Sequence, residues 1–167
     1  QLKFIDNPHW DTAEAIVSTY LAIELLAGAY LIEGDLYIKN NGVLRPYEYH
    51  STYCGIPGKV ENDWYFYADK NIRITHLAHG YSNGLYGAPH RFVGIMYWTP
   101  EEADKLKKDI QDVVARPNNQ HRFIESVPFD KLTDEYTIHA RALCKDDIVE
   151  IDTYQELQDL RYQECRK

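Results

Sequence analysis

Hydrophobic and polar positions along the 167-residue chain change period several times, and each period predicts an element. Residues 2–5 (LKFI) have the pattern of a first short strand. Residues 13–21 repeat apolar side chains at helical spacing after a cap pattern at residues 11–14, and Gly28 is expected to end that helix. Residues 29–38 then have the pattern of a second strand. The order strand, helix, strand predicts a parallel crossover unit in an α/β sheet.

Three further strands are predicted in the middle of the chain, over residues 64–68, 72–77 and 91–98. Turns with Gly, Asn and Pro flank and separate the first two of these strands. The sequence TPEE at residues 99–102 has the cap, the first-turn proline and the acidic third position of a helix start. The buried stripe of that helix is expected to consist of Ala103, Leu106, Ile110, Val113 and Val114.

The last third of the chain predicts a helical segment near residues 118–132 and strands at about residues 136–143 and 147–151. Thr153 and Glu156 form a second capping pattern, which predicts a final helix. Together the elements predict one α/β domain over residues 1–167, with a mixed rather than a purely parallel sheet.

Composition and charge narrow the class of partner. The formal net charge is −8 at pH 7, so neither a nucleic-acid backbone nor an anionic membrane surface is an expected partner. A net-acidic protein would hold a phosphate compound through a metal ion. The cysteines have no C-x-x-C spacing, and reduced thiols in a cytoplasmic protein are the simplest expectation. No apolar run reaches the length of a membrane span.

Pairs of carboxylates stand at the ends of two distant apolar strands. Residues 33–35 (EGD) follow YLI, and residues 150–152 (EID) follow DIV. Ligands of open α/β sheets gather beyond the carboxyl ends of strands, so Asp35 and Asp152 are candidates to share one Mg²⁺ ion. Two simpler interpretations stand beside this one. Asp35 could be an ordinary turn residue, and Asp152 could support the helix that begins at Thr153.

An aromatic cluster in residues 62–67 (NDWYFY) is a second candidate site. The face of Trp64 is a good platform for a quaternary ammonium group through cation–π attraction. The alternative is that Trp64 simply packs in the sheet.

Six stretches in order resemble one family: LKFIDNPHW, AIVSTYLA, YLIEGDLYI, NDWYFYADKN, FVGIMYWTPEEADKL and IVEIDTYQEL. They are similar to the bacterial choline-phosphate cytidylyltransferases of the sugar-phosphate nucleotidyltransferase superfamily, over nearly the whole chain. The resemblance implies a Rossmann-like α/β nucleotidyltransferase fold. It also implies a reaction in which phosphocholine attacks the α-phosphorus of CTP with Mg²⁺ as the essential ion.

The resemblance further implies roles for individual residues. The metal aspartates of the family match Asp35 and Asp152, which would then be both catalytic and metal-binding. The aromatic residue that meets the choline head matches Trp64. A second acid near the choline matches Glu125 in RFIESV. Glu150 matches the acid two residues before the second metal aspartate, which implies that it also faces the ammonium group of the substrate.

Two parts of the family pattern are absent from the sequence. The N-terminal loop G-x-G-[ST]-R-L is missing, and Glu14 and Ala15 stand where Thr-Asn-Asn is usual. The resemblance therefore covers the carboxyl-terminal portion of a nucleotidyltransferase domain, truncated at its N-terminus, and we expect this chain alone not to turn over CTP. A longer protein or a partner chain would supply the loop, or the activity has been lost.

The sequence leaves three other functions open. The acceptor of the transfer could be a sugar phosphate or an aminoalkyl phosphonate. The chain could be an inactive homologue that binds a small ligand or a partner. The resemblance could also reflect a shared fold alone.

Overall fold

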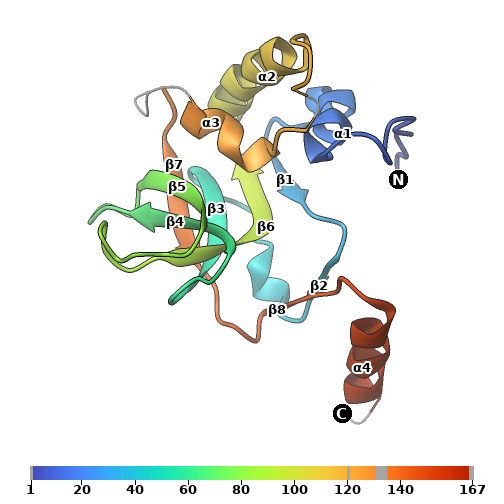
Figure 1. Cartoon of the computed structure of the whole chain (residues 1–167), viewed down its shortest axis with the longest axis vertical. Coiled ribbons are helices and arrows are strands. Elements are labelled where there is room, and N and C mark those ends of the chain that lie inside the picture. Colours follow the sequence, from blue (N-terminus) through green and yellow to red (C-terminus); the bar gives the residue numbers. More distant parts are fainter. Residues whose placement is uncertain (1, 120, 131–134, 166–167) are drawn as a thin grey trace.

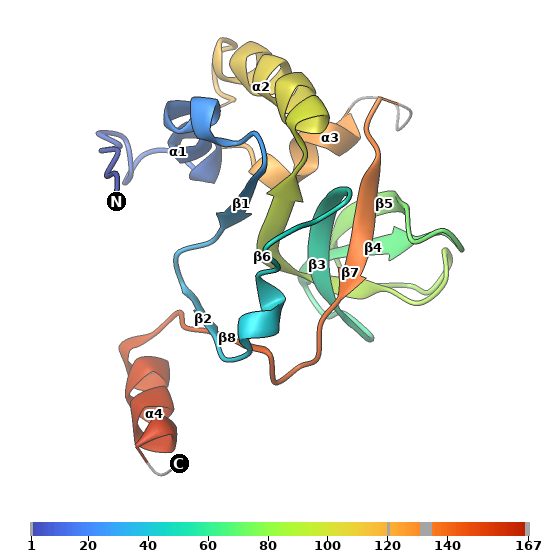
Figure 2. The same cartoon turned by 180° about the vertical axis from the view of Figure 1, so that it is seen from behind.

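A mixed sheet lies at the centre of the computed structural model, which describes residues 2–119, 121–130 and 135–165. The strand order is β5-β4-β6-β3-β7, and β1 also pairs with β6 (Figures 1 and 2). The strands are β1 (Ala29–Ile32), β3 (Ser51–Pro57), β4 (Asp63–Ala68), β5 (Ile74–Gly80), β6 (His90–Trp98) and β7 (Ile138–Ala142). Only β3 and β7 pair in parallel among these described strands, so the mixed sheet that the sequence predicts is confirmed.

Helices gather at the end of the sheet where β6 finishes (Figure 1). They are α1 (Ala15–Leu21), α2 (Pro100–Val114) and α3 (Val127–Asp130), with the 3₁₀ turns η1 (Ile23–Leu25) and η3 (Ile124–Ser126). The main core lies between them and the sheet, and Ile16, Trp98 and Leu106 are fully buried there. The predicted start of α2 is confirmed, because the Thr99 side chain accepts a hydrogen bond from the backbone N–H of Glu102.

A second, two-stranded sheet lies apart from the first. It pairs β2 (Leu36–Ile38) with β8 (Ile148–Glu150), and the 3₁₀ turn η2 (Asn41–Val43) follows β2. The helix α4 (Tyr154–Glu164) comes after β8 and projects away from the main sheet in both views (Figures 1 and 2). None of the helices in the described part of the chain has the length and apolar character of a membrane-spanning segment.

The predicted strand at residues 2–5 is wrong. These residues form no strand, and Leu2 and Phe4 are 84% and 90% exposed. The cap predicted at residues 11–14 also comes too early, because α1 begins at Ala15 and its N-cap residue, Glu14, makes no side-chain capping hydrogen bond. An apolar period alone predicts a face to be buried, but a strand forms only where a partner strand is available.

The parallel crossover unit at the start of the chain is wrong as well. The stretch 29–38 is two strands instead of one, because residues 33–35 leave the first sheet and deliver β2 to the second. β1 pairs antiparallel with β6, with Ala29 opposite Trp98 and Ile32 opposite Ile95.

The helix predicted near residues 118–132 is shorter than expected. Only η3 and α3, over residues 124–130, are helical within the described residues, and positions 120, 131 and 132 lie outside them. The strands predicted at residues 136–143 and 147–151 are confirmed in their cores as β7 and β8, and the final helix is confirmed as α4.

A glycine in β6 makes room for the residue that follows β1. Gly94 has φ +65°, a left-handed conformation, and its carbonyl oxygen accepts a hydrogen bond of 3.0 Å from the backbone N–H of Glu33. A Cβ atom at position 94 would overlap the Glu33 carboxylate. The position therefore needs a residue without a side chain, both for the backbone conformation and for the neighbouring acid.

We expect Gly94→Ala to destabilise the protein by about 1–2 kcal/mol, because an L-residue pays that cost in the left-handed region. The Glu33 side chain has to move in addition. Gly34→Ala is the matched control, since a Cβ there meets nothing within 4 Å, and we expect a change of less than about 0.5 kcal/mol. Urea denaturation of both variants measures the difference. Equal stabilities would contradict the role assigned to Gly94.

Candidate metal centre and adjoining cavity

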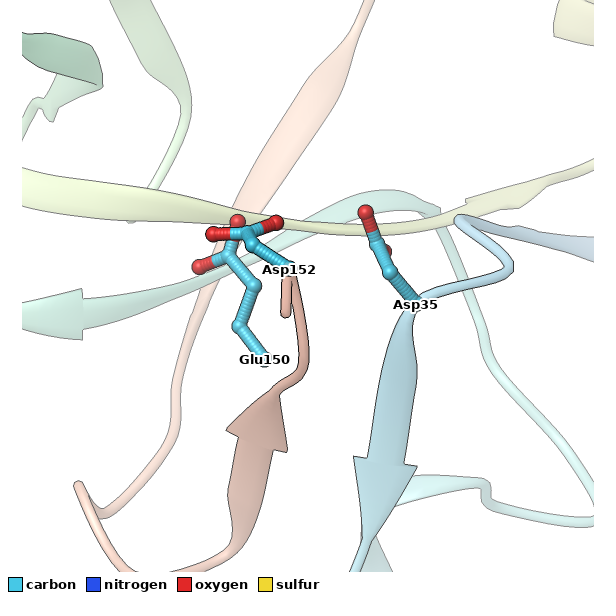
Figure 3. Close-up of side chains that lie close together, drawn as sticks. All are labelled: Asp35, Glu150 and Asp152. Atoms are coloured by element: carbon cyan, nitrogen blue, oxygen red, sulfur yellow. The ribbon is translucent and has the colours of Figure 1, made fainter. Parts of the chain in front are cut away.

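Three carboxylates from two distant segments meet at one end of the β2–β8 pair. One carboxylate oxygen each from Asp35, Glu150 and Asp152 lies within 4.8 Å of the others, and all three side chains are exposed. Figure 3 shows Asp35 approaching from the β2 side, with Glu150 and Asp152 on the β8 side. The convergence expected of Asp35 and Asp152 is thus present in the structure, and Glu150 joins them. Their binding of a metal stays a prediction.

Strand register explains the convergence. Leu36 lies opposite Glu150, and one step further the backbone N–H of Ile151 donates to the Asp35 carbonyl oxygen at 2.9 Å. Antiparallel pairing therefore places the residue before β2 beside the residues that end β8. Because side chains alternate between faces, Glu150 and Asp152 point the same way.

The cap of α4 holds the backbone at Asp152 without using the Asp152 carboxylate. Thr153 is the N-cap residue of a capping box, and the Glu156 carboxylate accepts backbone hydrogen bonds from Asp152 and Thr153 at 2.9 and 2.8 Å. Figure 3 shows the Asp152 carboxylate beside that of Glu150, with Asp35 across from them. The simpler interpretation, in which Asp152 supports the helix, and the interpretation as a metal ligand both stay predictions.

A cation that the sequence analysis missed stands beside the three carboxylates. Nη1 of Arg91, on β6, lies 3.0 Å from Glu150 Oε2 and 3.3 Å from Asp63 Oδ2. The other oxygen of Asp63 accepts the backbone N–H of Trp64 at 2.7 Å. These partly exposed ion pairs contribute about 1 kcal/mol or less to stability, so their main effect is to orient Glu150. No spacing in the sequence relates Arg91 to Glu150, because the two lie on different sheets.

A cavity of about 540 Å³ adjoins the carboxylates and shares Asp35 with them. Its walls come from α1, the end of β1 and η3, and apolar side chains such as Leu31, Met96 and Ile124 form much of them. Three further acids, Glu14, Glu33 and Glu125, also line it. Glu125 is only 2% exposed, and its carbonyl oxygen accepts a 3.1 Å hydrogen bond from the buried Tyr53 hydroxyl, which anchors η3.

Two acids of the cavity, Glu33 and Glu125, have a raised pKa. Burial raises the pKa of Glu125 to about 7; its own backbone N–H opposes the shift and the charge of Glu14 adds to it. Burial is also the main reason that the pKa of Glu33 is about 7, and the neighbouring charges of Glu125 and Asp35 raise it further. Glu33 was not a candidate site residue from the sequence, where it stood out only as part of EGD. Its position two residues before Asp35 was the available signal, since side chains two apart in an extended segment share a face.

Trp64 lies next to the cavity, and it is not among the described residues that line it. Its half-buried ring packs edge-on against Phe123, with centroids 5.7 Å apart, and against His79 at 5.3 Å. Phe123 is the aromatic residue on the cavity wall. The structure thus brings Asp35, Glu150 and Asp152 together, places Glu125 in the adjoining cavity and leaves Trp64 behind Phe123.

Solved structures show which fold this is. The CTP:phosphocholine cytidylyltransferase LicC from Streptococcus pneumoniae is similar with a TM-score of 0.80 at 21% identity, over 94% of this chain and 66% of LicC. A nucleoside-diphosphate-sugar pyrophosphorylase from Vibrio cholerae has a TM-score of 0.57 at 12% identity, over 88% of this chain and 62% of that protein. HddC from Yersinia pseudotuberculosis has a TM-score of 0.55 at 13% identity, over 90% of this chain and 62% of HddC.

These likenesses show the Rossmann-like nucleotidyltransferase fold that the sequence predicts. The chain spans just under two thirds of the length of the structures that it matches. No protein-family model and no curated protein sequence matches the chain. At identities this low, the shared fold does not carry the chemistry with it, so the function has to be argued from the side chains of the site.

The raised pKa of Glu125 makes stability depend on pH. Its pKa rises from 4.5 to about 7 on folding, so between these pH values the folded state binds more protons than the unfolded state. We expect the free energy of unfolding to fall by up to about 3 kcal/mol from this group as pH rises through that window. Glu125→Gln should remove this part of the slope, as measured by urea denaturation at several pH values. The exposed Glu101→Gln should leave the slope unchanged, and an unaltered slope in Glu125→Gln would contradict the expected proton uptake.

Proposed function

We propose that this chain carries the metal-binding and acceptor-binding side of a nucleotidyltransferase, which transfers CMP from CTP to a small phosphorylated amine such as phosphocholine. The observation that carries the proposal is the meeting of Asp35, Glu150 and Asp152, whose oxygens lie within 4.8 Å of one another although the residues are far apart in sequence. The fold shared with LicC, which is named as a CTP:phosphocholine cytidylyltransferase, supports the choice of reaction.

The three carboxylates fit Mg²⁺ in both ligand type and exposure. Mg²⁺ prefers oxygen ligands and keeps several waters, which suits a small set of exposed carboxylates better than a closed cage. Bound there, Mg²⁺ would neutralise phosphate charge as the new bond forms. Asp35 and Asp152 are the proposed ligands, and Arg91 holds one oxygen of Glu150 in place beside them.

The cavity fits the amine end of the acceptor. It begins at Asp35, so a ligand whose phosphate lies at the carboxylates can extend its other end toward Glu125. We assign the positive end of the acceptor to Glu125, whereas Glu150 is not among the described residues that line the cavity and lies with the carboxylates of the metal site. Trp64 contributes by supporting the Phe123 ring on the cavity wall.

Metal binding tests the carboxylate site directly. We expect Asp35→Asn and Asp152→Asn each to weaken Mg²⁺ binding by at least about tenfold, because each removes one charged ligand. Isothermal titration with Mg²⁺, or electron paramagnetic resonance with Mn²⁺, measures the affinity. Asp104→Asn is the matched control, because Asp104 is exposed on α2 and outside the site. Unchanged affinity in both site variants would remove the basis of the proposal.

A second candidate function is acceptor binding without turnover. Glu14 and Ala15 line the cavity, at the positions where the family resemblance implies Thr-Asn-Asn. An acid and an alanine offer a nucleotide fewer hydrogen-bond donors than that sequence would.

Turnover separates the two functions. With CTP, Mg²⁺ and a phosphorylated amine, we expect no nucleotidyl product from this chain alone, because the glycine-rich loop is not part of its sequence. Chromatographic detection of CDP-choline or its amine analogue measures the product. Addition of a segment that supplies the loop should restore turnover for the transferase and should not for the binding homologue. Robust product formation by the chain alone would show that the loop is unnecessary.

A further inference from the structure

Among the acids that line the cavity, Glu33 and Glu125 have no side-chain partner in the described part of the chain that neutralises them. Among the described residues, no side chain donates a hydrogen bond to the carboxylate of Glu33 or Glu125, and the donor near Glu125 is its own backbone N–H. Arg91 already forms ion pairs with Glu150 and Asp63. Glu125 is 2% exposed, and its own backbone N–H is the donor beside its carboxylate, so a ligand with N–H groups would supply further donors there.

The lining of the cavity narrows the kind of ligand. No Lys, Arg or His is among the described residues that line it, and apolar side chains make up most of the rest. Buried carboxylates are costly without an opposite charge or a hydrogen-bond donor. A small organic cation suits both the apolar wall and the acids, because its carbon atoms contact the wall and its charge lies at the carboxylates.

The aromatic content of the lining separates two kinds of cation. A quaternary ammonium group has no N–H, and proteins bind it mainly with the faces of several aromatic rings. Here Phe123 is the aromatic ring among the described lining residues, and Trp64 packs edge-on behind it. A primary or secondary ammonium group donates charge-assisted hydrogen bonds to carboxylates, and two unpartnered carboxyl groups suit that chemistry better.

We propose that the cavity binds the amino end of a phosphorylated primary or secondary amine, whose N–H groups donate to the carboxylates of Glu33 and Glu125. The chain would therefore prefer phosphoethanolamine to phosphocholine. This inference rests on the proposed function, because the carboxylates at Asp35 and Asp152 would hold the phosphate end through Mg²⁺. Glu33 then becomes a residue that determines which amine is accepted.

A methylation series tests the preference. Isothermal titration in the presence of Mg²⁺ compares phosphoethanolamine with its N-methyl and N,N-dimethyl derivatives and with phosphocholine. We expect the affinity to fall along the series, by at least about tenfold from phosphoethanolamine to phosphocholine. Equal or tighter binding of phosphocholine overturns the proposal, and so does the absence of binding by every member of the series.

Two variants show whether the acids are responsible. Glu33→Gln and Glu125→Gln should each weaken phosphoethanolamine binding by at least about tenfold and reduce its preference over phosphocholine. The exposed Glu24→Gln should change neither. Glu33 is exposed, so its variant serves if replacement of the buried Glu125 disturbs folding, which circular dichroism reveals. Wild-type preference in a folded Glu33→Gln variant overturns the role of Glu33.

Inorganic phosphate distinguishes this inference from the proposed function. If Mg²⁺ and phosphate bind together, and Asp152→Asn abolishes this, while the amines show no preference, only the inference about the amine fails. If Mg²⁺ does not bind the wild-type chain, both the proposed function and the inference about the amine fail.

Discussion

The pairing of β2 with β8 is the contact on which the candidate site depends. Each strand has only three residues, yet their register places Asp35 beside Glu150 and Asp152 across more than a hundred residues of chain. A slip of one residue would turn every side chain of β8 to the opposite face and separate the acids. The capping box that starts α4 follows directly and fixes the backbone of Asp152 and Thr153 where β8 ends.

Electrostatic repulsion between the carboxylates opposes their convergence. The same concentration of negative charge attracts cations. The chain is already net acidic, and the site gathers three exposed carboxylates with three more acids, Glu14, Glu33 and Glu125, in the adjoining cavity. Arg91 forms ion pairs with Glu150 and Asp63, so it neutralises part of this negative charge. The remaining negative charge favours cations at two neighbouring places. The exposed carboxylates suit a hydrated divalent ion, and the cavity, with the buried Glu125 and its apolar walls, suits an organic cation. One ligand with a phosphate at one end and an amine at the other matches both.

The fold explains how the cavity forms but does not choose its ligand. Gly94 adopts a left-handed conformation in β6, which leaves space for the Glu33 carboxylate, and Tyr53 anchors η3 so that Glu125 faces inward. LicC shares this fold at 21% identity, and the other solved structures share it at lower identity. The specificity of this chain therefore depends on the few side chains that line the cavity rather than on the architecture around them.

Local interactions allowed the sequence to predict β6, the start of α2 and the cap of α4, since strand propensity and capping depend on neighbours a few residues away. The acids at the ends of apolar stretches were also visible in the sequence, so Asp35, Glu150 and Asp152 could be named in advance. The partner of each strand could not be predicted, because a hydrophobic period of two residues specifies which face of the strand is buried and not which strand lies beside it. For that reason residues 2–5 were expected to form a strand, and β1 was expected to pair in parallel. The contact of Arg91 with Glu150, the space at Gly94 and the meeting of Glu33 and Glu125 in one cavity arise only when separate segments pack together, because no short-range pattern encodes them.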